Sequence, residues 1–247
     1  MKLRDLTVFM EQKAPAALAE EWDKVGLLVD SGNADVSGVV VALDATPAAI
    51  AFAKERGANV LVTHHPVIFD PIVTLTPDHP AAMAFAAGIS VFSAHTNLDS
   101  AAGGVNDTLA GLLGLTNVTV TVDGMTRVGT LPAPMTAKAF AALAATTLHT
   151  AAQVTVPDAT ISRIAVCGGA AGDNLHTAMQ TADAYLTGEL KHNLFLHAKA
   201  ANFPVIAAGH YATEMPVVHT VTAWLRESFL AVDITAFEDT APYITVM

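Results

Sequence analysis

The chain has 247 residues, of which 52% are hydrophobic and 14% are charged, and its formal net charge is −11 at pH 7. This length and apolar content suit one large domain or two lobes with a sizeable core. The negative charge argues against a protein that coats nucleic acid through phosphate contacts, and the single cysteine excludes an intrachain disulfide.

Charged residues near the N-terminus interrupt the apolar core that a signal peptide needs. The longest uncharged stretch, residues 139–157, contains several threonines, His149 and Gln153, which is not the character of a membrane span. The sequence alone therefore indicates a cytoplasmic protein with no membrane partner. Cys167 follows an apolar run and is expected to be a buried strand residue.

The first half of the chain alternates between helix and strand patterns. Helical spacing over residues 3–21 breaks near Pro15. Thr46 and Pro47 are typical of a helix N-cap and first turn, and Gly57 is typical of the position just after a helix. The other expected elements are strands over residues 27–29, 39–43, 59–62, 89–92 and 117–122, and helices over residues 47–56, 81–87 and 103–113.

The pattern changes near residue 125. A turn-rich crossing covers residues 124–134, and an alanine-rich helix follows over residues 137–148. We therefore predict an N-terminal α/β lobe over residues 1–125 and a C-terminal α/β lobe over residues 126–247. The last segment of the chain can pack back on the first lobe.

The second half of the chain repeats the first. Strand, helix and strand over residues 162–187 match those over residues 37–63, and a third strand in each half ends just before His95 or His210. Strands that alternate with helices pair in parallel through right-handed crossovers. Because ligands of open α/β sheets sit at the carboxyl edge of the strands, the residues just after each strand are the candidates for chemistry.

Two adjacent histidines, His64 and His65, follow the apolar strand that ends at Thr63. Successive side chains of a strand point to opposite faces, but Pro66 cannot continue the ladder. Both imidazoles can therefore turn to one cavity and bind neighbouring metal ions. Taken alone, the pair agrees better with the alternative that one histidine packs under a helix and the other is solvated.

A histidine and a carboxylate follow the third strand of each half, namely His95 with Asp99 and His210 with Glu214. At a spacing of four on a helical turn, the two side chains share a face. Together with the adjacent histidine pair they form a set of nitrogen and oxygen ligands that suits Zn, Mn or Fe(II). One carboxylate bridging two ions holds them about 3.5–4 Å apart. The alternative is that all these residues serve as caps and turns.

Five separated motifs carry a resemblance to a known family. They are Trp22-Asp23-Lys24-Val25-Gly26-Leu27, Thr63-His64-His65-Pro66, His95-Thr96-Asn97-Leu98-Asp99, Thr187-Gly188-Glu189 and Gly209-His210-Tyr211-Ala212-Thr213-Glu214. In this order, over nearly the whole chain, they resemble the NIF3-like family, also known as YbgI-like or DUF34, whose members are named GTP cyclohydrolase 1 type 2 homologue in many genomes. The chain is similar to the short bacterial form, which lacks the domain inserted in longer members. Lys24 is a departure, because asparagine is common there in the family.

The resemblance implies two similar α/β lobes with a dinuclear metal site in the cleft between them, and assembly as a toroidal homohexamer. His95 is not a usual ligand in that pattern. It is a candidate acid or base or a residue that contacts the metal ligands, although in some settings it could reach a metal. Glu214 is the implied bridge between two divalent transition-metal ions (Zn, Fe or Mn). The ligands that the motifs carry over to this chain are His64, His65, Asp99, His210 and Glu214.

Other residues carry weaker signals. Glu189 follows a strand and is either a general acid or base or a solvated loop residue. The glycine-rich turn over residues 168–173 could present backbone N–H groups to a phosphate, although it lacks the Walker lysine. The two tryptophans, Trp22 and Trp224, are expected to be packing residues.

The leading hypothesis from the sequence is a metal-dependent hydrolase of this family that acts on a small molecule such as a nucleotide. If the family name describes the reaction, water attacks C8 of the guanine in GTP. The five-membered ring opens, and C8 leaves as formate to give dihydroneopterin triphosphate. A dinuclear site can also hydrolyse phosphoesters or amides. The alternative is a non-enzymatic metal-binding hexameric scaffold or metal-handling protein, and the net charge disfavours nucleic-acid binding through the ring.

Overall fold

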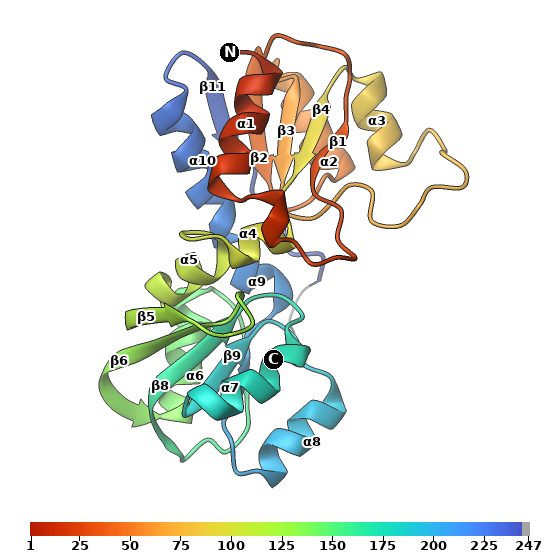
Figure 1. Cartoon of the computed structure of the whole chain (residues 1–247). Coiled ribbons are helices and arrows are strands. Elements are labelled where there is room, and N and C mark those ends of the chain that lie inside the picture. The colour runs from red at the N-terminus through yellow and green to blue at the C-terminus, as the bar shows by residue number, and fades with distance from the viewer. Residues whose placement is uncertain (244–247) are drawn as a thin grey trace. The chain divides into compact units, whose positions relative to one another are not determined.

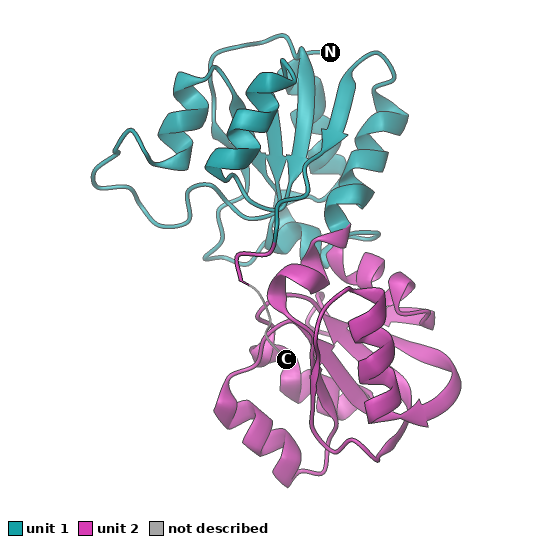
Figure 2. Ribbon diagram, turned by 180° about the vertical axis from the view of Figure 1, so that it is seen from behind, with its two compact units in different colours: residues 1–104, 217–240 teal, residues 105–216, 241–247 magenta. Residues whose placement is uncertain are grey.

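The computed structural model of the chain describes residues 1–243 and divides into two compact units. Unit 1 comprises residues 1–104 and 217–240, and unit 2 comprises residues 105–216 and 241–243 (Figure 2). Each unit contains one mixed β-sheet with helices around it (Figure 1). The first unit ends at Gly104 rather than near residue 125. The helix that follows packs against the second sheet, and the next two strands are part of that sheet.

The sheet of unit 1 has the strand order β1–β4–β3–β2–β11. The three strands of the first repeat, β2, β3 and β4, pair in parallel, as predicted, and β11 extends them in parallel at one edge. Strand β1, which lies outside the repeat, is antiparallel to β4. The strands are β1 (Gly26–Val29), β2 (Gly38–Ala42), β3 (Val60–Thr63), β4 (Ser90–Ser93) and β11 (Asp233–Ala236).

Helices cover both faces of this sheet, because alternate residues of its buried strands face opposite ways. Val40 and Leu61 pack with α2 and α3, whereas Val41 and Val62 lie beside Met10 of α1 and the first turns of α10. The helices of unit 1 are α1 (Leu3–Lys13), α2 (Pro47–Glu55), α3 (Pro80–Ala86), α4 (Thr96–Ser100) and α10 (Pro216–Ser228), with a 3₁₀ turn, η1 (Ala16–Leu18).

The sheet of unit 2 has the order β5–β6–β8–β9–β10–β7. Its central strands β8, β9 and β10 pair in parallel and form the second copy of the predicted repeat. The other pairings involve strands outside the repeat and are antiparallel. The strands are β5 (Thr116–Val120), β6 (Arg127–Thr136), β7 (Gln153–Val154), β8 (Thr160–Cys167), β9 (Ala184–Thr187) and β10 (Val205–Ala207).

The predicted turn-rich crossing over residues 124–134 is instead largely strand β6. Its two prolines, Pro132 and Pro134, fall where the pairing with β8 loses its regular register between Thr130 and Met135. A proline has no N–H to give to a ladder, so it is tolerated at such an irregularity. The composition of this stretch is typical of a turn, but its two ends are paired with β8.

Helices also lie on both faces of the second sheet (Figure 1). Ile164 and Leu186 pack with α5 and α6 on one face, and Tyr185 packs with α7 and α8 on the other. Cys167 is buried at the end of β8, as predicted. No helix of the described residues is long and apolar enough to cross a membrane. The helices are α5 (Val105–Leu112), α6 (Ala137–Thr147), α7 (Leu175–Thr181), α8 (His192–Ala200) and α9 (His210–Glu214), with a 3₁₀ turn, η2 (Gly172–Asn174).

The predicted N-cap of α2 is confirmed and gives a stability test. The Thr46 hydroxyl oxygen accepts a hydrogen bond from Ala49 N at 3.1 Å, and the hydroxyl donates to Asp239 Oδ2 at 2.9 Å. Thr46→Ala is expected to lower the free energy of unfolding by about 1 kcal/mol, the usual cost of losing such a cap. Thr146→Ala, at an exposed position of α6, is the control, with an expected change below about 0.5 kcal/mol. Equal midpoints in urea for the two variants would contradict the assignment.

Candidate metal centre

The histidine pair of unit 1 emerges at the carboxyl edge of two adjacent parallel strands. Thr63, the last residue of β3, lies opposite Ser93, the last residue of β4. The Thr63 hydroxyl donates to the His65 carbonyl oxygen at 2.8 Å and lies 2.9 Å from Ser93 Oγ. These contacts turn the chain sharply just after β3. The rings of His64 and His65 consequently lie side by side, with centroids 4.9 Å apart, although strand alternation would separate them.

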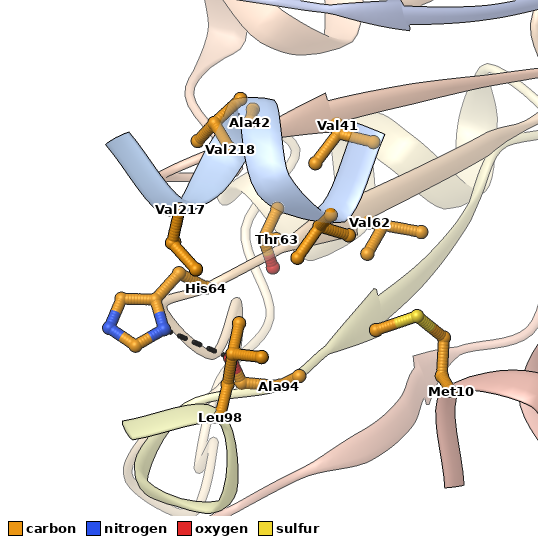
Figure 3. A pocket seen from close by; sticks show the side chains of 11 residues that line it. Met10, Val41, Ala42, Val62, Thr63, His64, Ala94, Leu98, Val217 and Val218 are labelled. Carbon is orange, nitrogen blue, oxygen red and sulfur yellow. Dashed lines mark hydrogen bonds between the residues drawn. The ribbon is translucent and has the colours of Figure 1, made fainter. Parts of the chain in front are cut away.

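His64 is buried, with only 2% of its surface exposed, and its ring is held by a hydrogen bond to the backbone of Ala94 (Figure 3). Its Nδ1 lies 3.0 Å from the Ala94 carbonyl oxygen, and its Nε2 lies 3.7 Å from Asp99 Oδ1. Because a carbonyl oxygen only accepts, Nδ1 carries the proton and the Nε2 lone pair faces the carboxylate. Behind the ring is a small cavity of about 10 Å³ lined mainly by apolar residues, among them Leu98 and Val217 (Figure 3). This apolar wall fixes the ring.

His65 is oriented by a carboxylate. Its Nδ1 lies 2.8 Å from Oδ1 of Asp44, which follows β2, the neighbouring strand of the sheet. A carboxylate or carbonyl on one ring nitrogen is the arrangement that metal-binding histidines have in proteins, since it fixes the tautomer and leaves the other nitrogen for the ion. His64 and His65 both have such a partner. Asp44 was not among the predicted residues, although its place after a strand of the same sheet could have indicated it.

The ring of His95 lies beside those of His64 and His65, with centroids 5.2 Å and 5.6 Å away. The candidate ligand atoms of His64, His65 and His95 all lie within 4.8 Å of one another, so this group of unit 1 could hold a metal ion. His95 Nδ1 lies 2.8 Å from Oδ1 of Asp23. Asp23 also accepts hydrogen bonds from the backbone N–H and the hydroxyl of Thr96. Burial would raise the pKa of Asp23, but the hydrogen bonds from His95 and Thr96 outweigh it and hold the pKa well below its usual value.

Asp99 lies on the short helix α4, which starts directly after His95. The backbone N–H of Asp99 donates to the His95 carbonyl oxygen at 3.0 Å, which closes one helical turn between them. Asp99 is buried, 9% exposed, and its carboxylate faces His64. In unit 1 the structure therefore brings together the predicted ligands His64, His65 and Asp99 with the predicted acid or base His95.

Unit 2 carries a second group at the equivalent edge of its sheet. His210 and Glu214 are the first and last residues of α9, which follows β10, and His210 Nε2 lies 3.0 Å from Glu214 Oε2. Glu189, in the turn after β9, has its Oε2 3.7 Å from His210 Nδ1. Glu214 is buried, whereas Glu189 is more than half exposed. In unit 2 the four-residue spacing therefore places a histidine and a carboxylate in contact.

Two glycines allow the neighbouring loops to pack directly against α9. Gly169 has a φ of +64°, and a Cβ added to it would collide with Glu214 Oε1. A Cβ on Gly188 would lie 2.8 Å from the Cα of His210. The glycine-rich turn after β8, which the sequence suggested for phosphate binding, therefore lies against the Glu214 carboxylate. Sequence reasoning missed this role, although the glycines were visible.

Gly169→Ala is expected to displace the Glu214 carboxylate and lower the metal content of the purified protein. Gly114→Ala is a matched control, because Gly114 also has a positive φ, +70°, but a Cβ there meets no atom within 4 Å. The two variants share the same backbone strain, about 1–2 kcal/mol, and differ in the contacts of the new Cβ with the Glu214 carboxylate and, at 3.4 Å, with His210 Nε2. Elemental analysis should find metal retained in Gly114→Ala and largely lost in Gly169→Ala. Equal metal content would show that metal binding does not depend on the close packing of Gly169 against the Glu214 carboxylate.

Comparisons with known proteins agree with the motifs. The model of the Duf34/NIF3 (NGG1p interacting factor 3) family matches residues 1–242. A Lactococcus lactis protein named "GTP cyclohydrolase 1 type 2 homolog" is 33% identical over 100% of both chains, and a Streptomyces coelicolor protein of the same name is 35% identical over 92% of this chain and 86% of its own. A crystal structure of a hypothetical protein from Staphylococcus aureus has a TM-score of 0.91 at 25% identity, covering 100% of this chain and 99% of that one. The chain belongs to the Duf34/NIF3 family.

Proposed function

We propose that this chain is a dinuclear metal-dependent hydrolase. The proposed ligands are His64, His65 and Asp99 of unit 1 and His210 and Glu214 of unit 2. The observation that carries the proposal is the tautomer control of the histidine pair, since His64 Nδ1 is held by the Ala94 carbonyl and His65 Nδ1 by Asp44. A purely structural pair of histidines does not require that both rings be fixed through the same nitrogen.

The donor set fits divalent Zn, Fe or Mn. Imidazole nitrogens and carboxylate oxygens without a thiolate suit these ions, and the buried carboxylates Asp99 and Glu214 need a positive charge nearby. Such ions act as Lewis acids and lower the pKa of bound water. We assign the bridging role to Glu214.

The chain's own residues supply proton transfer and orientation. His95 has its Nδ1 proton directed to Asp23, which leaves Nε2 as the atom that accepts a proton from, or returns one to, the reacting molecule. Glu189 Oε2 lies 3.7 Å from His210 Nδ1, and we assign Glu189 the role of a second acid or base. Both residues were candidates in the sequence.

The proposed reaction is a GTP cyclohydrolase-type ring opening, with GTP and water giving formate and dihydroneopterin triphosphate. The support for this choice is the name that the curated relatives carry. We also propose a homohexamer, as the family resemblance implies, which light scattering on the purified protein would test by its molar mass.

The test is to incubate the metal-loaded protein with GTP and with a panel of phosphoesters. Formate release from GTP that disappears in His64→Ala is the expected result. Release of phosphate instead would assign a phosphoesterase to the same site. Metal-loaded protein that turns over no compound would overturn the hydrolase and favour a non-enzymatic metal-binding scaffold.

A further inference from the structure

Two large aromatic rings lie exposed beside the histidine group of unit 1. Trp22 is 54% exposed and Phe69 is 48% exposed, and their ring centroids are 5.7 Å apart. The His95 ring lies 6.1 Å from that of Trp22 and 6.3 Å from that of Phe69. Trp22 is therefore not the packing residue that the sequence suggested. A fully packed tryptophan would be covered on its faces by other side chains.

The backbone on both sides holds these rings in place. Asp23, next to Trp22, is tied to His95 and to Thr96, and Glu20 N donates to the Thr96 hydroxyl at 3.0 Å. The turn that carries Trp22 is thus fixed to the start of α4. Phe69 follows Val67 and Ile68, which pack against the core of unit 1. The rings are exposed on anchored segments, so their exposure is a property of the fold.

We propose that Trp22 and Phe69 form a platform on which a planar heteroaromatic ring of the substrate stacks beside His95. The two rings are inclined by 52°, so they do not cover each other in a parallel stack. Lys24 lies next to them, with its ammonium donating to the Trp22 carbonyl oxygen at 3.0 Å, and offers a positive charge to a phosphate in a chain of net charge −11. A base that carries phosphate is the ligand that matches rings, cation and imidazole together.

This inference deepens the proposed function and rests on it only in assigning the ring to the substrate of the same site. Its test therefore uses metal-free protein, in which binding of the ring does not depend on turnover. Trp224→Phe serves as the parent, because Trp22 is then the only tryptophan of the chain. Guanosine and GTP are expected to quench the Trp22 fluorescence, whereas ribose 5-phosphate, which has no base, leaves it unchanged.

Calorimetry with guanosine gives the size of the effect. Trp22→Ala and Phe69→Ala are each expected to weaken binding about 5- to 150-fold, the range for loss of one aromatic ring that stacks on a base. Trp22→Phe, which keeps a ring, should restore most of the affinity. Because both side chains are half exposed, circular dichroism should find the variants folded.

Two results would overturn the inference. One is that guanosine and GTP leave the Trp22 emission and the calorimetric trace unchanged in metal-free protein. The other is that Trp22→Ala alters the molar mass of the assembly without altering guanosine binding, which would make the platform an interface with a second copy of the chain. Failure of the hydrolase proposal has a different signature, namely ring binding without metal-dependent turnover.

Discussion

Alanine in place of Glu214 is expected to release most of the bound metal while the protein stays folded. The side chain is 4% exposed, and its carboxylate contacts His210 across one turn of α9. Loss of an outer partner of a metal ligand typically costs 10–100-fold in affinity, and loss of a bridging ligand should cost more than about 100-fold. Without metal, removing a buried carboxylate carries little penalty, because that charge is itself costly to bury.

The measurement is metal content by elemental analysis after extensive dialysis, with circular dichroism as the check on folding. Glu227→Ala is the control, since Glu227 is an exposed glutamate of α10, and it should keep the parent's metal content. Unchanged metal content in Glu214→Ala would remove Glu214 from the ligand set.

Asparagine in place of Asp44 is expected to weaken metal binding about 10- to 100-fold, the usual effect of losing a carboxylate that orients a metal-bound histidine. Asp44 is the partner of His65 Nδ1 at 2.8 Å. Asp23 stands in the same relation to His95, also at 2.8 Å. The two variants therefore form a matched pair, in which one partner orients a proposed ligand and the other orients the proposed acid or base.

Asp23→Asn should leave metal affinity within a few-fold of the parent and lower turnover instead, because His95 loses the group that fixes its tautomer. Competition with a chromogenic chelator would give both affinities. Equal weakening in the two variants would make His95 a metal ligand, contrary to the assignment. An unchanged affinity in Asp44→Asn would show that His65 needs no such support.

Sequence reasoning reached most of the site because its residues lie at strand ends and in a helical spacing. His64 and His65 directly follow β3, and the pairs that begin at His95 and at His210 each span a single turn of helix. Both patterns are local, so they can be read from neighbouring residues. The repeated strand–helix–strand order likewise predicted the parallel core of both sheets, and the structure confirms it.

The remaining features depend on contacts between residues distant in the chain. Asp44 and Asp23 become partners of histidines only when β2 and the first loop meet the ends of β3 and β4. The role of Gly169 depends on a carboxylate 45 positions later, at Glu214. The antiparallel edge strands and the exposure of Trp22 likewise follow from tertiary packing, which overrides local propensity. Local pattern could mark some of these residues, such as Asp44 at the end of a strand, but it could not assign their distant partners.

The metal content of the purified chain is the direct test of the dinuclear site. After loading with Zn, Fe(II) or Mn under anaerobic conditions and removal of free ions, we predict about two transition-metal ions per chain, as expected for a dinuclear site. The same count should fall sharply in Glu214→Ala and stay at the parent value in Glu227→Ala. A content near zero under all three loading conditions would show that these residues do not form a metal site.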